Sequence, residues 1–412
     1  MISFDKFTLK NGLRVVVHQD QSTSMAAMIV MYDVGSRDEN PEKTGFAHLF
    51  EHLMFGGSAN IPKYDEPLEK AGGINNAYTT NDLTTYYLSL PAQNLETAFW
   101  LESDRMNMLA FSEKSLEVQR NVVTEEFRQT HLNQPYGDAW LLLSPLAYKV
   151  HPYQWPTIGR EISHIQNAVM EDVRTFYNRF YNPNNAILVV AGNVDLTDVM
   201  RLSEKWFAPI ANQGQNIRML PKEPEQTEMR FLETCRDVPS EMIFKVWKMC
   251  SRLDAKYHAT DLLSDIFGNG NSSRFYRNLI MEQKLFTELD AYITGSLDEG
   301  LFVISGRLSP GISLEKADHA ISLEISKLQD KRIDDSELQK VKNKAEVQLT
   351  FSRMNIINKA ISLAFGELIG DAGLINTETE KYQAVTSEQI LSIAQELLTP
   401  ERCSTLYYRT QK

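Results

Sequence analysis

Hydrophobic positions along the first half of the chain switch between strand spacing and helix spacing. Residues 7–9 and 13–18 flank the turn dipeptide Asn11-Gly12, a pattern that predicts a β-hairpin. Residues 25–32 predict a buried strand, and residues 45–55 carry apolar side chains at helical spacing, with Thr44 as the expected N-cap. The other predicted elements of this half are helices at 65–71, 95–108, 112–129 and 170–177, one or two strands within 76–90, and a strand at 186–191.

The stretch 211–226 is rich in Gln, Asn, Gly and Pro, and it predicts a linker. The elements predicted after it are strands at 241–247, 289–292 and 302–308, and helices at 258–267, 274–282, 314–329 and 335–351. This order repeats the first half in outline, without the sequence identity that marks a repeat. We therefore expect an α+β protein of two similar domains, 1–215 and 225–412, each with a mainly antiparallel sheet and flanking helices.

The formal net charge of −12 argues against nucleic acid or an anionic membrane as the main partner. The three cysteines are widely spaced and odd in number, which argues against a disulfide framework. The first residues have neither the basic nor the apolar region of a signal peptide, so we expect a cytoplasmic protein, although a chain trimmed of its leader would look the same.

The pentapeptide His48-Leu49-Phe50-Glu51-His52 carries the clearest chemistry. On a helix, positions i, i+3 and i+4 share one face, so two imidazoles can bind one zinc ion while Glu51 activates a water beside it. This is the inverted HxxEH form of a zinc-peptidase motif. The alternative is a polar helix face with solvated histidines, but the helix is otherwise apolar, and buried ionisable groups are costly unless they are paired or bound to metal.

A catalytic zinc site usually has three protein ligands, so a third is needed. The predicted helix at 112–129 contains Glu125 and Glu126, whose side chains point about 100° apart on a helix. Glu126 shares a face with Val122 and Val123, and we expect that face to be interior. Periodicity favours Glu126 over Glu125 only modestly.

Several passages of the chain together resemble the pitrilysin or insulinase family of zinc peptidases, in particular the shorter branch that includes the mitochondrial processing peptidase. In the first half they are GFAHLFEHLMF (45–55), GGINNAYT (72–79), DLTTY (82–86), RNVVTEE (120–126), HPY (151–153) and YNPNN (181–185). In the second half, NSSRFY (271–276) resembles the matching family segment less specifically.

The resemblance implies His48, His52 and Glu126 as ligands of one zinc ion per chain and Glu51 as the base. It also implies that the two domains form half of a clam-like chamber, completed by a second chain in a homodimer or heterodimer. Members of the family bind peptide as an added strand at the edge of a sheet. The resemblance therefore implies that Asn76 and Ala77 contact the substrate. A plain turn residue is the alternative for Asn76.

Two departures from the family pattern matter. Where many members have a supporting glutamate, seven positions before the distal ligand, this chain has Gln119, which can hydrogen-bond to a ligand but carries no charge. Active members also use an Arg and a Tyr from the C-terminal half; Arg307 is the candidate here, with a solvated strand-end charge as its alternative, and no Tyr follows it suitably. The sequence therefore favours a zinc endopeptidase or oligopeptidase, with an inactive binding or structural subunit of the same family as the rival hypothesis.

Overall fold

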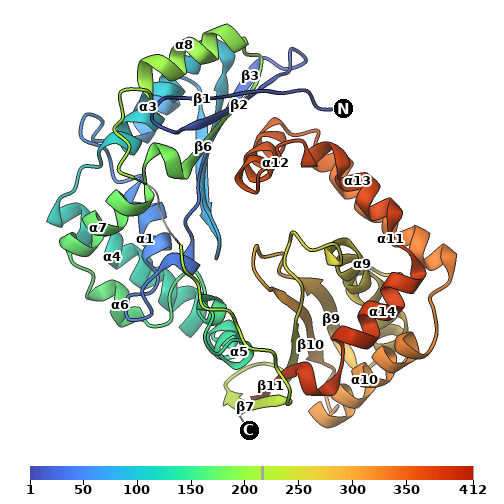
Figure 1. Cartoon of the computed structure of the whole chain (residues 1–412). Coiled ribbons are helices and arrows are strands. Elements are labelled where there is room, and N and C mark those ends of the chain that lie inside the picture. Colours follow the sequence, from blue (N-terminus) through green and yellow to red (C-terminus); the bar gives the residue numbers. More distant parts are fainter. Residues whose placement is uncertain (215–217, 412) are drawn as a thin grey trace. The chain divides into compact units, whose positions relative to one another are not determined.

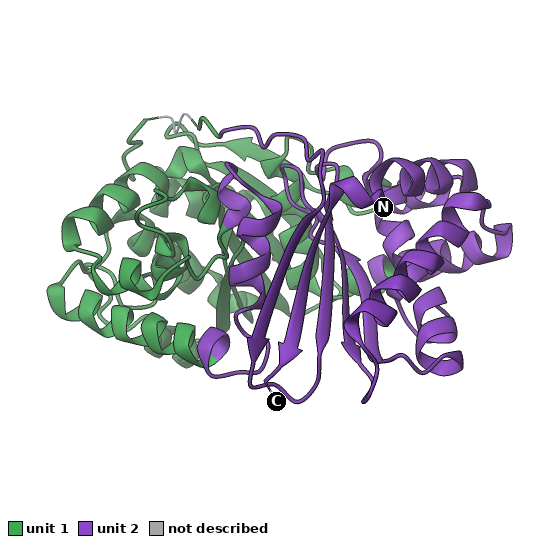
Figure 2. Cartoon of the chain, turned by 90° about the horizontal axis from the view of Figure 1, so that it is seen from below, with its two compact units in different colours: residues 1–129, 155–220, 350–377 green, residues 130–154, 221–349, 378–412 purple. Residues whose placement is uncertain are grey.

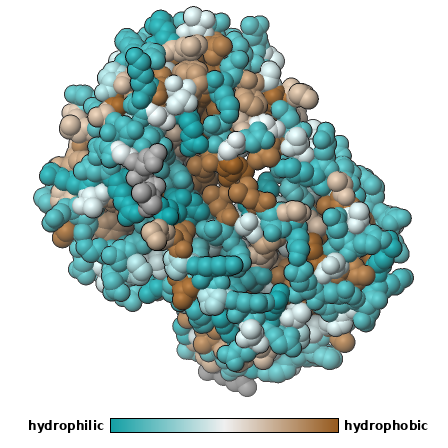
Figure 3. Space-filling view, viewed as in Figure 1, coloured by the Kyte–Doolittle hydropathy of each residue, from teal (hydrophilic) through white to brown (hydrophobic). Residues whose placement is uncertain are grey.

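The computed structural model describes residues 1–214 and 218–411. It divides into two compact units, which Figure 2 colours separately. Unit 1 comprises residues 1–129, 155–220 and 350–377, and unit 2 comprises residues 130–154, 221–349 and 378–412. Hydrophilic residues cover most of the molecular face drawn in Figure 3.

Unit 1 is built on a six-stranded sheet, in which β2 and β6 are parallel and every other neighbouring pair is antiparallel. Its strands in spatial order are β1 (Asp5–Thr8), β2 (Arg14–Gln19), β6 (Ala186–Gly192), β3 (Met25–Tyr32), β5 (Thr84–Pro91) and β4 (Ile74–Thr79). The central strands β3 and β6 are almost entirely buried, because helices cover both faces of the sheet. The strand β4 lies at one edge of this sheet.

One face of this sheet carries the helices of the first half of the chain (Figure 1). They are α1 (Phe46–Leu53), α2 (Asp65–Lys70), α3 (Leu95–Asn107), α4 (Glu113–Phe127), α6 (Ile162–Gln166), α7 (Met170–Phe180) and α8 (Leu196–Trp206). The other face is covered by α12 (Ile356–Leu368), which packs Leu363 and Ala364 against Ile29, Ile187 and Val189 of the strands.

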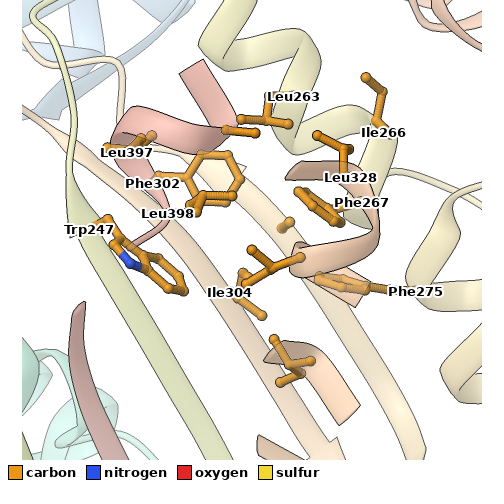
Figure 4. Close-up of a cluster of buried hydrophobic side chains, with 14 of the residues drawn as sticks. Trp247, Leu263, Ile266, Phe267, Phe275, Phe302, Ile304, Leu328, Leu397 and Leu398 are labelled. Atoms are coloured by element: carbon orange, nitrogen blue, oxygen red, sulfur yellow. The ribbon is translucent and has the colours of Figure 1, made fainter. Parts of the chain in front are cut away.

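Unit 2 contains a five-stranded sheet with the same topology as β2 to β6. Its strands in spatial order are β7 (Arg230–Arg236), β11 (Cys403–Thr410), β8 (Met242–Lys248), β10 (Leu301–Leu308) and β9 (Phe286–Ile293). One face packs on α9 (Tyr257–Gly268), α10 (Leu314–Asp330), α14 (Ser387–Leu397) and most of α11 (Asp335–Ser352), around the core drawn in Figure 4. The opposite face is covered by α5 (Ala139–Ala147).

The two halves of the chain thus exchange one helix each. The helix α5 follows α4 in sequence but packs on the second sheet, and α12 follows α11 but packs on the first. The compact units therefore do not coincide with the predicted contiguous domains 1–215 and 225–412, since residues 130–154 and 350–377 lie with the other half. The predicted α+β class, with two similar sheets and flanking helices, is confirmed.

Most predicted elements are present, and the differences have local causes. The predicted N-cap Thr44 is wrong, because α1 begins after Gly45 and has no side-chain cap from that position. The predicted helix at 274–282 is a π-helical segment over Tyr276–Glu282. Part of the predicted linker at 211–226 lies outside the described residues. Within the described residues, no helix is both long and apolar enough to cross a membrane.

Candidate metal centre

The helix α1 owes its position to a buried carboxylate at its N-terminus. The Glu39 side chain accepts the backbone N–H of Gly45 at 2.8 Å, that of Ala47 at 2.9 Å and the indole N–H of Trp155 at 3.0 Å. Free N–H groups at a helix start favour a negative charge, whereas burial opposes it. Burial is the larger effect and raises the pKa of Glu39 to about 8.

Gly45 makes this tight start possible. Its φ is +89°, in the left-handed region, and a Cβ there would lie 2.7 Å from the carbonyl oxygen of Ile158. Thr44 has another role than the predicted cap: its hydroxyl accepts the Arg160 N–H at 2.8 Å and contacts His164 Nδ1 at 2.8 Å. Contacts with the segment 155–166 therefore hold the residues just before α1 in place.

The C-terminal end of α1 lies beside a cluster of aromatic side chains. The Tyr86 hydroxyl donates to the carbonyl of Phe50 at 3.3 Å. The guanidinium of Arg105 lies over the rings of Phe55, Tyr64 and Tyr86, and it pairs with the buried Glu102 at 2.6 Å. A helix fixed at both ends can hold side chains on its exposed face in set positions.

Three side chains from α1 and α4 converge on one point. The Nε2 atoms of His48 and His52 are 3.4 Å apart, and the Glu126 carboxylate lies 3.7 Å from the first and 3.3 Å from the second. The potential ligand atoms of the three residues all lie within 4.8 Å of one another. The structure thus brings together all three residues that the sequence proposed as ligands.

These separations fit a zinc ion. Ligand atoms at about 2.0–2.1 Å from zinc and at tetrahedral angles lie about 3.3–3.4 Å from one another. The donor set, two imidazoles and one carboxylate, is also a common set at catalytic zinc sites, where a fourth position stays open for water or substrate.

The two candidate glutamates on α4 have different surroundings. Glu126 faces the histidines, whereas Glu125 is 53% exposed and lies beside Arg128 and Gln129, at 3.5 and 3.3 Å. The expectation that the Glu126 face is interior is wrong in part: Val123 is buried, but Val122 is 44% exposed. The Glu126 side chain itself is 39% exposed.

Glu51 lies on α1 beside the ligand histidines and is bonded to β4. Its carboxylate accepts the Thr79 hydroxyl at 2.6 Å. Burial raises the pKa of Glu51, and the hydrogen bond from Thr79 offsets part of this effect. The carboxylate is therefore a stronger base than a solvated glutamate would be.

Gln119 is placed two helical turns before Glu126 on the same helix. A Cβ on Gly56, just after α1, would lie 3.9 Å from the amide nitrogen of Gln119, so this side chain lies near the end of α1. Glu117 is exposed and paired with Arg120, as its different helix face predicts.

The predicted substrate contacts Asn76 and Ala77 lie on the edge strand β4. The side-chain oxygen of Asn76 accepts the backbone N–H of Ala77 at 2.8 Å. Ala77 itself is buried, but its N–H is bonded by a side chain and not by the neighbouring strand, so it is directed away from β5.

Arg307 lies in unit 2, near the end of β10. It contacts Glu288 at 3.5 Å, and its guanidinium lies 5.4 Å from the ring centre of Tyr136. The sequence has no Tyr close after Arg307. Tyr136, from the segment between α4 and α5, lies beside it, and the Tyr136 hydroxyl donates to the carbonyl of Ser240 at 2.6 Å. No local pattern could have revealed this pair.

Sequence reasoning also missed Thr79, Glu39 and Trp155. Thr79 closes the segment GGINNAYT, and its alternation with Ala77 on a strand was the signal that could have found it. Glu39 and Trp155 stand far from the HxxEH motif in sequence, and only the fold brings them to the start of α1.

Comparisons with known proteins identify the family of the chain. The family model described as "Insulinase (Peptidase family M16)" matches residues 14–157, and that described as "Peptidase M16 inactive domain" matches residues 167–345. The zinc protease PqqE of Helicobacter pylori is 32% identical over 344 residues, which cover 82% of this chain and 77% of the relative. The chain therefore belongs to peptidase family M16.

Further relatives carry similar descriptions. The uncharacterized zinc protease YmxG of Bacillus subtilis is 24% identical, with 96% of each chain covered. The probable mitochondrial-processing peptidase subunit beta of Arabidopsis thaliana is 24% identical, covering 83% of this chain and 66% of the relative. The crystal structure of a protease from Helicobacter pylori superposes with a TM-score of 0.93 at 28% identity, covering 99% of this chain and 100% of that one.

Proposed function

We propose that this chain is a zinc-dependent metallopeptidase that hydrolyses peptide bonds of peptides or unfolded segments. The observation that carries the proposal is the convergence of His48, His52 and Glu126, at separations that suit one zinc ion per chain, with Glu51 beside them. The family membership and the descriptions of relatives as zinc proteases support the same reaction class.

In the proposed reaction, residues of the chain would bind zinc and transfer the proton. Zinc, when bound, supplies a Lewis acid that polarises the scissile carbonyl and lowers the pKa of a water molecule. Glu51 accepts a proton from the attacking water, and the same carboxyl then gives that proton to the nitrogen of the leaving amine as the C–N bond breaks. The Glu51 carboxylate accepts a hydrogen bond from the Thr79 hydroxyl.

The edge strand β4 is the proposed binding place for substrate. An extended peptide can add to a free strand edge through backbone hydrogen bonds, which leaves selectivity for side chains loose. Asn76 and Ala77 are the proposed contacts, and the Asn76 side chain must release the Ala77 N–H when a peptide carbonyl takes its place. A second chain of the family is the proposed partner that completes the chamber, with Arg307 as a further candidate substrate contact.

The test is turnover of a quenched-peptide mixture by the purified protein, with bound metal quantified, beside Glu51→Gln. We expect about one zinc per chain in both proteins and cleavage by the wild type alone, because the substitution keeps the ligands and removes the base. Bound zinc with no cleavage by either protein, even after candidate partner chains are added, would favour the inactive binding subunit. A wild type that binds no zinc would refute the proposal.

A further inference from the structure

The edge strand β4 presents alternate backbone groups to its free side. In an antiparallel pair, successive residues direct their N–H and C=O groups alternately toward the neighbouring strand and away from it. The Thr80 N–H bonds the carbonyl of Leu83 across the turn to β5, whereas the N–H of Ala77 is bonded by the Asn76 side chain. Ala77 and Thr79 are therefore the residues whose backbone groups face away from β5.

Different side chains form hydrogen bonds at these two positions on the free edge of β4. The bond to Ala77 comes from the side chain of its own neighbour, so a peptide carbonyl can replace it without breaking a contact between elements. At Thr79 the side-chain hydroxyl instead donates to Glu51 of α1, at 2.6 Å. Thr79 is also the last residue of β4, and the chain turns at Thr80, whose N–H bonds the carbonyl of Leu83 at 2.9 Å.

We propose that Thr79 is a positioning residue that holds the base Glu51 and ends the peptide ladder at Ala77, which fixes the scissile bond beside the metal centre. This inference rests on the proposed peptidase function. The Glu51 carboxylate takes the edge position that the next substrate residue would otherwise occupy. A bound peptide can pair with β4 up to Ala77, and its following residue must leave the strand where Glu51 and the histidines lie.

The contribution of Thr79 comes from its hydroxyl group. This donor fixes the rotation of the Glu51 carboxylate about its last bond. A β-branched side chain in a strand has few rotamers, so the hydroxyl is held in place before substrate arrives. Valine has the same shape without the donor, and serine keeps the donor without the methyl group.

The experiment compares Thr79→Val and Thr79→Ser with the wild type and with Thr124→Val as the matched control. The Thr124 hydroxyl is buried on α4, two residues from Glu126, and has no hydrogen-bond partner among the described residues. Each zinc-loaded protein is assayed for kcat and KM on one quenched peptide, and the cleaved bonds are mapped by mass spectrometry. Zinc content, thermal unfolding and the affinity of the zinc-free protein for the peptide are measured alongside.

We expect Thr79→Val to lower kcat by about tenfold to a hundredfold, a part of what proton transfer contributes. Its KM, zinc content and zinc-free peptide affinity should stay within about twofold, since a hydroxyl that only orients the base adds nothing to substrate or metal binding. We also expect cleavage at bonds next to the main one. Thr79→Ser should recover most of kcat and the single cleavage site, and Thr124→Val should match the wild type.

Two results would overturn the inference while the proposed function stands. One is a Thr79→Val enzyme with the wild-type kcat and the wild-type cleavage site. The other is a loss of kcat that Thr79→Ser shares fully, or that is accompanied by loss of zinc or of thermal stability. A wild type that binds no zinc and cleaves no peptide refutes the proposed function and this inference with it.

Discussion

Glu39 gives the start of the metal-bearing helix a dependence on pH. Its pKa is raised to about 8 in the folded chain, against an ordinary value of 4.5. Between these values the folded state keeps a proton that the unfolded state has lost, so the free energy of unfolding falls as pH rises, by at most about 1.4 kcal/mol per pH unit from this group. Glu39→Gln carries no titrating proton. We expect the stability difference between wild type and variant to change across pH 5 to 8, as measured by urea unfolding; parallel curves would contradict this.

The adjacent residues Glu125 and Glu126 form a natural pair for testing the third ligand. Glu126→Gln replaces a carboxylate that faces both histidines by a neutral amide, so we expect zinc affinity to fall by about a hundredfold or more. Glu125→Gln removes the same charge from an exposed position on the same helix and should leave the affinity within about twofold. Competition with a chromogenic chelator measures both. Equal losses would show that Glu126 acts through net charge and not as a ligand.

At this scale, the sequence could identify the residues that share one helix. His48, Glu51 and His52 follow from spacing alone, because four residues of an α-helix bring two side chains to one face. The choice of Glu126 over Glu125 needed the family resemblance, since the two differ by only one position on a helix whose buried face was misjudged at Val122. Thr79 and Glu39 contact α1 from other elements, so the spacing within the HxxEH motif could not show these contacts.

Among the elements, we expect α1 to depend on Gly45, the residue just before it. Gly45→Ala places a side chain in the left-handed region, which costs about 1–2 kcal/mol, and its Cβ would also meet the Ile158 carbonyl at 2.7 Å. Gly370, at φ +99°, has nothing within 4 Å, so Gly370→Ala carries the backbone strain without the clash. We expect Gly45→Ala to lose more stability than Gly370→Ala in urea unfolding, and it alone to lose zinc affinity. Equal effects would show that the clash is relieved at no cost.

Sequence periodicity predicted the elements whose apolar pattern is set by a single sheet or helix face. The run Met25–Tyr32 and the helix Leu95–Asn107 match their predicted positions within a residue, because each has one clear buried surface. The helices α5 and α12 were not anticipated. The helix α5 contains Pro145, a residue that usually ends a helix, and its packing partners lie far away in sequence. Local pattern cannot show which sheet a helix will cover.

For the whole molecule, the exchange of α5 and α12 decides which pieces of the chain can fold. Residues 1–220 include every strand of the first sheet but not α12, whose Ala360, Leu363 and Ala364 are fully buried against it. Without this helix, a face formed by Ile29, Ile187 and Val189 meets water. Exposed apolar patches of this kind lead to association. A cut at the boundary suggested by composition near the linker therefore separates the first sheet from α12.

We accordingly expect the fragment 1–220 to aggregate or to bind a hydrophobic dye strongly, whereas the full chain does neither. A synthetic peptide of residues 350–377, added in trans, should lower dye binding and raise the midpoint of urea unfolding, because it restores the missing layer. A peptide of the same composition in scrambled order is the control, since it lacks the apolar face of α12. If the fragment alone unfolds at the same urea concentration as the full chain, α12 is dispensable for the first sheet. Zinc binding by the fragment, with and without the peptide, then tells whether the far face of the sheet influences the metal centre.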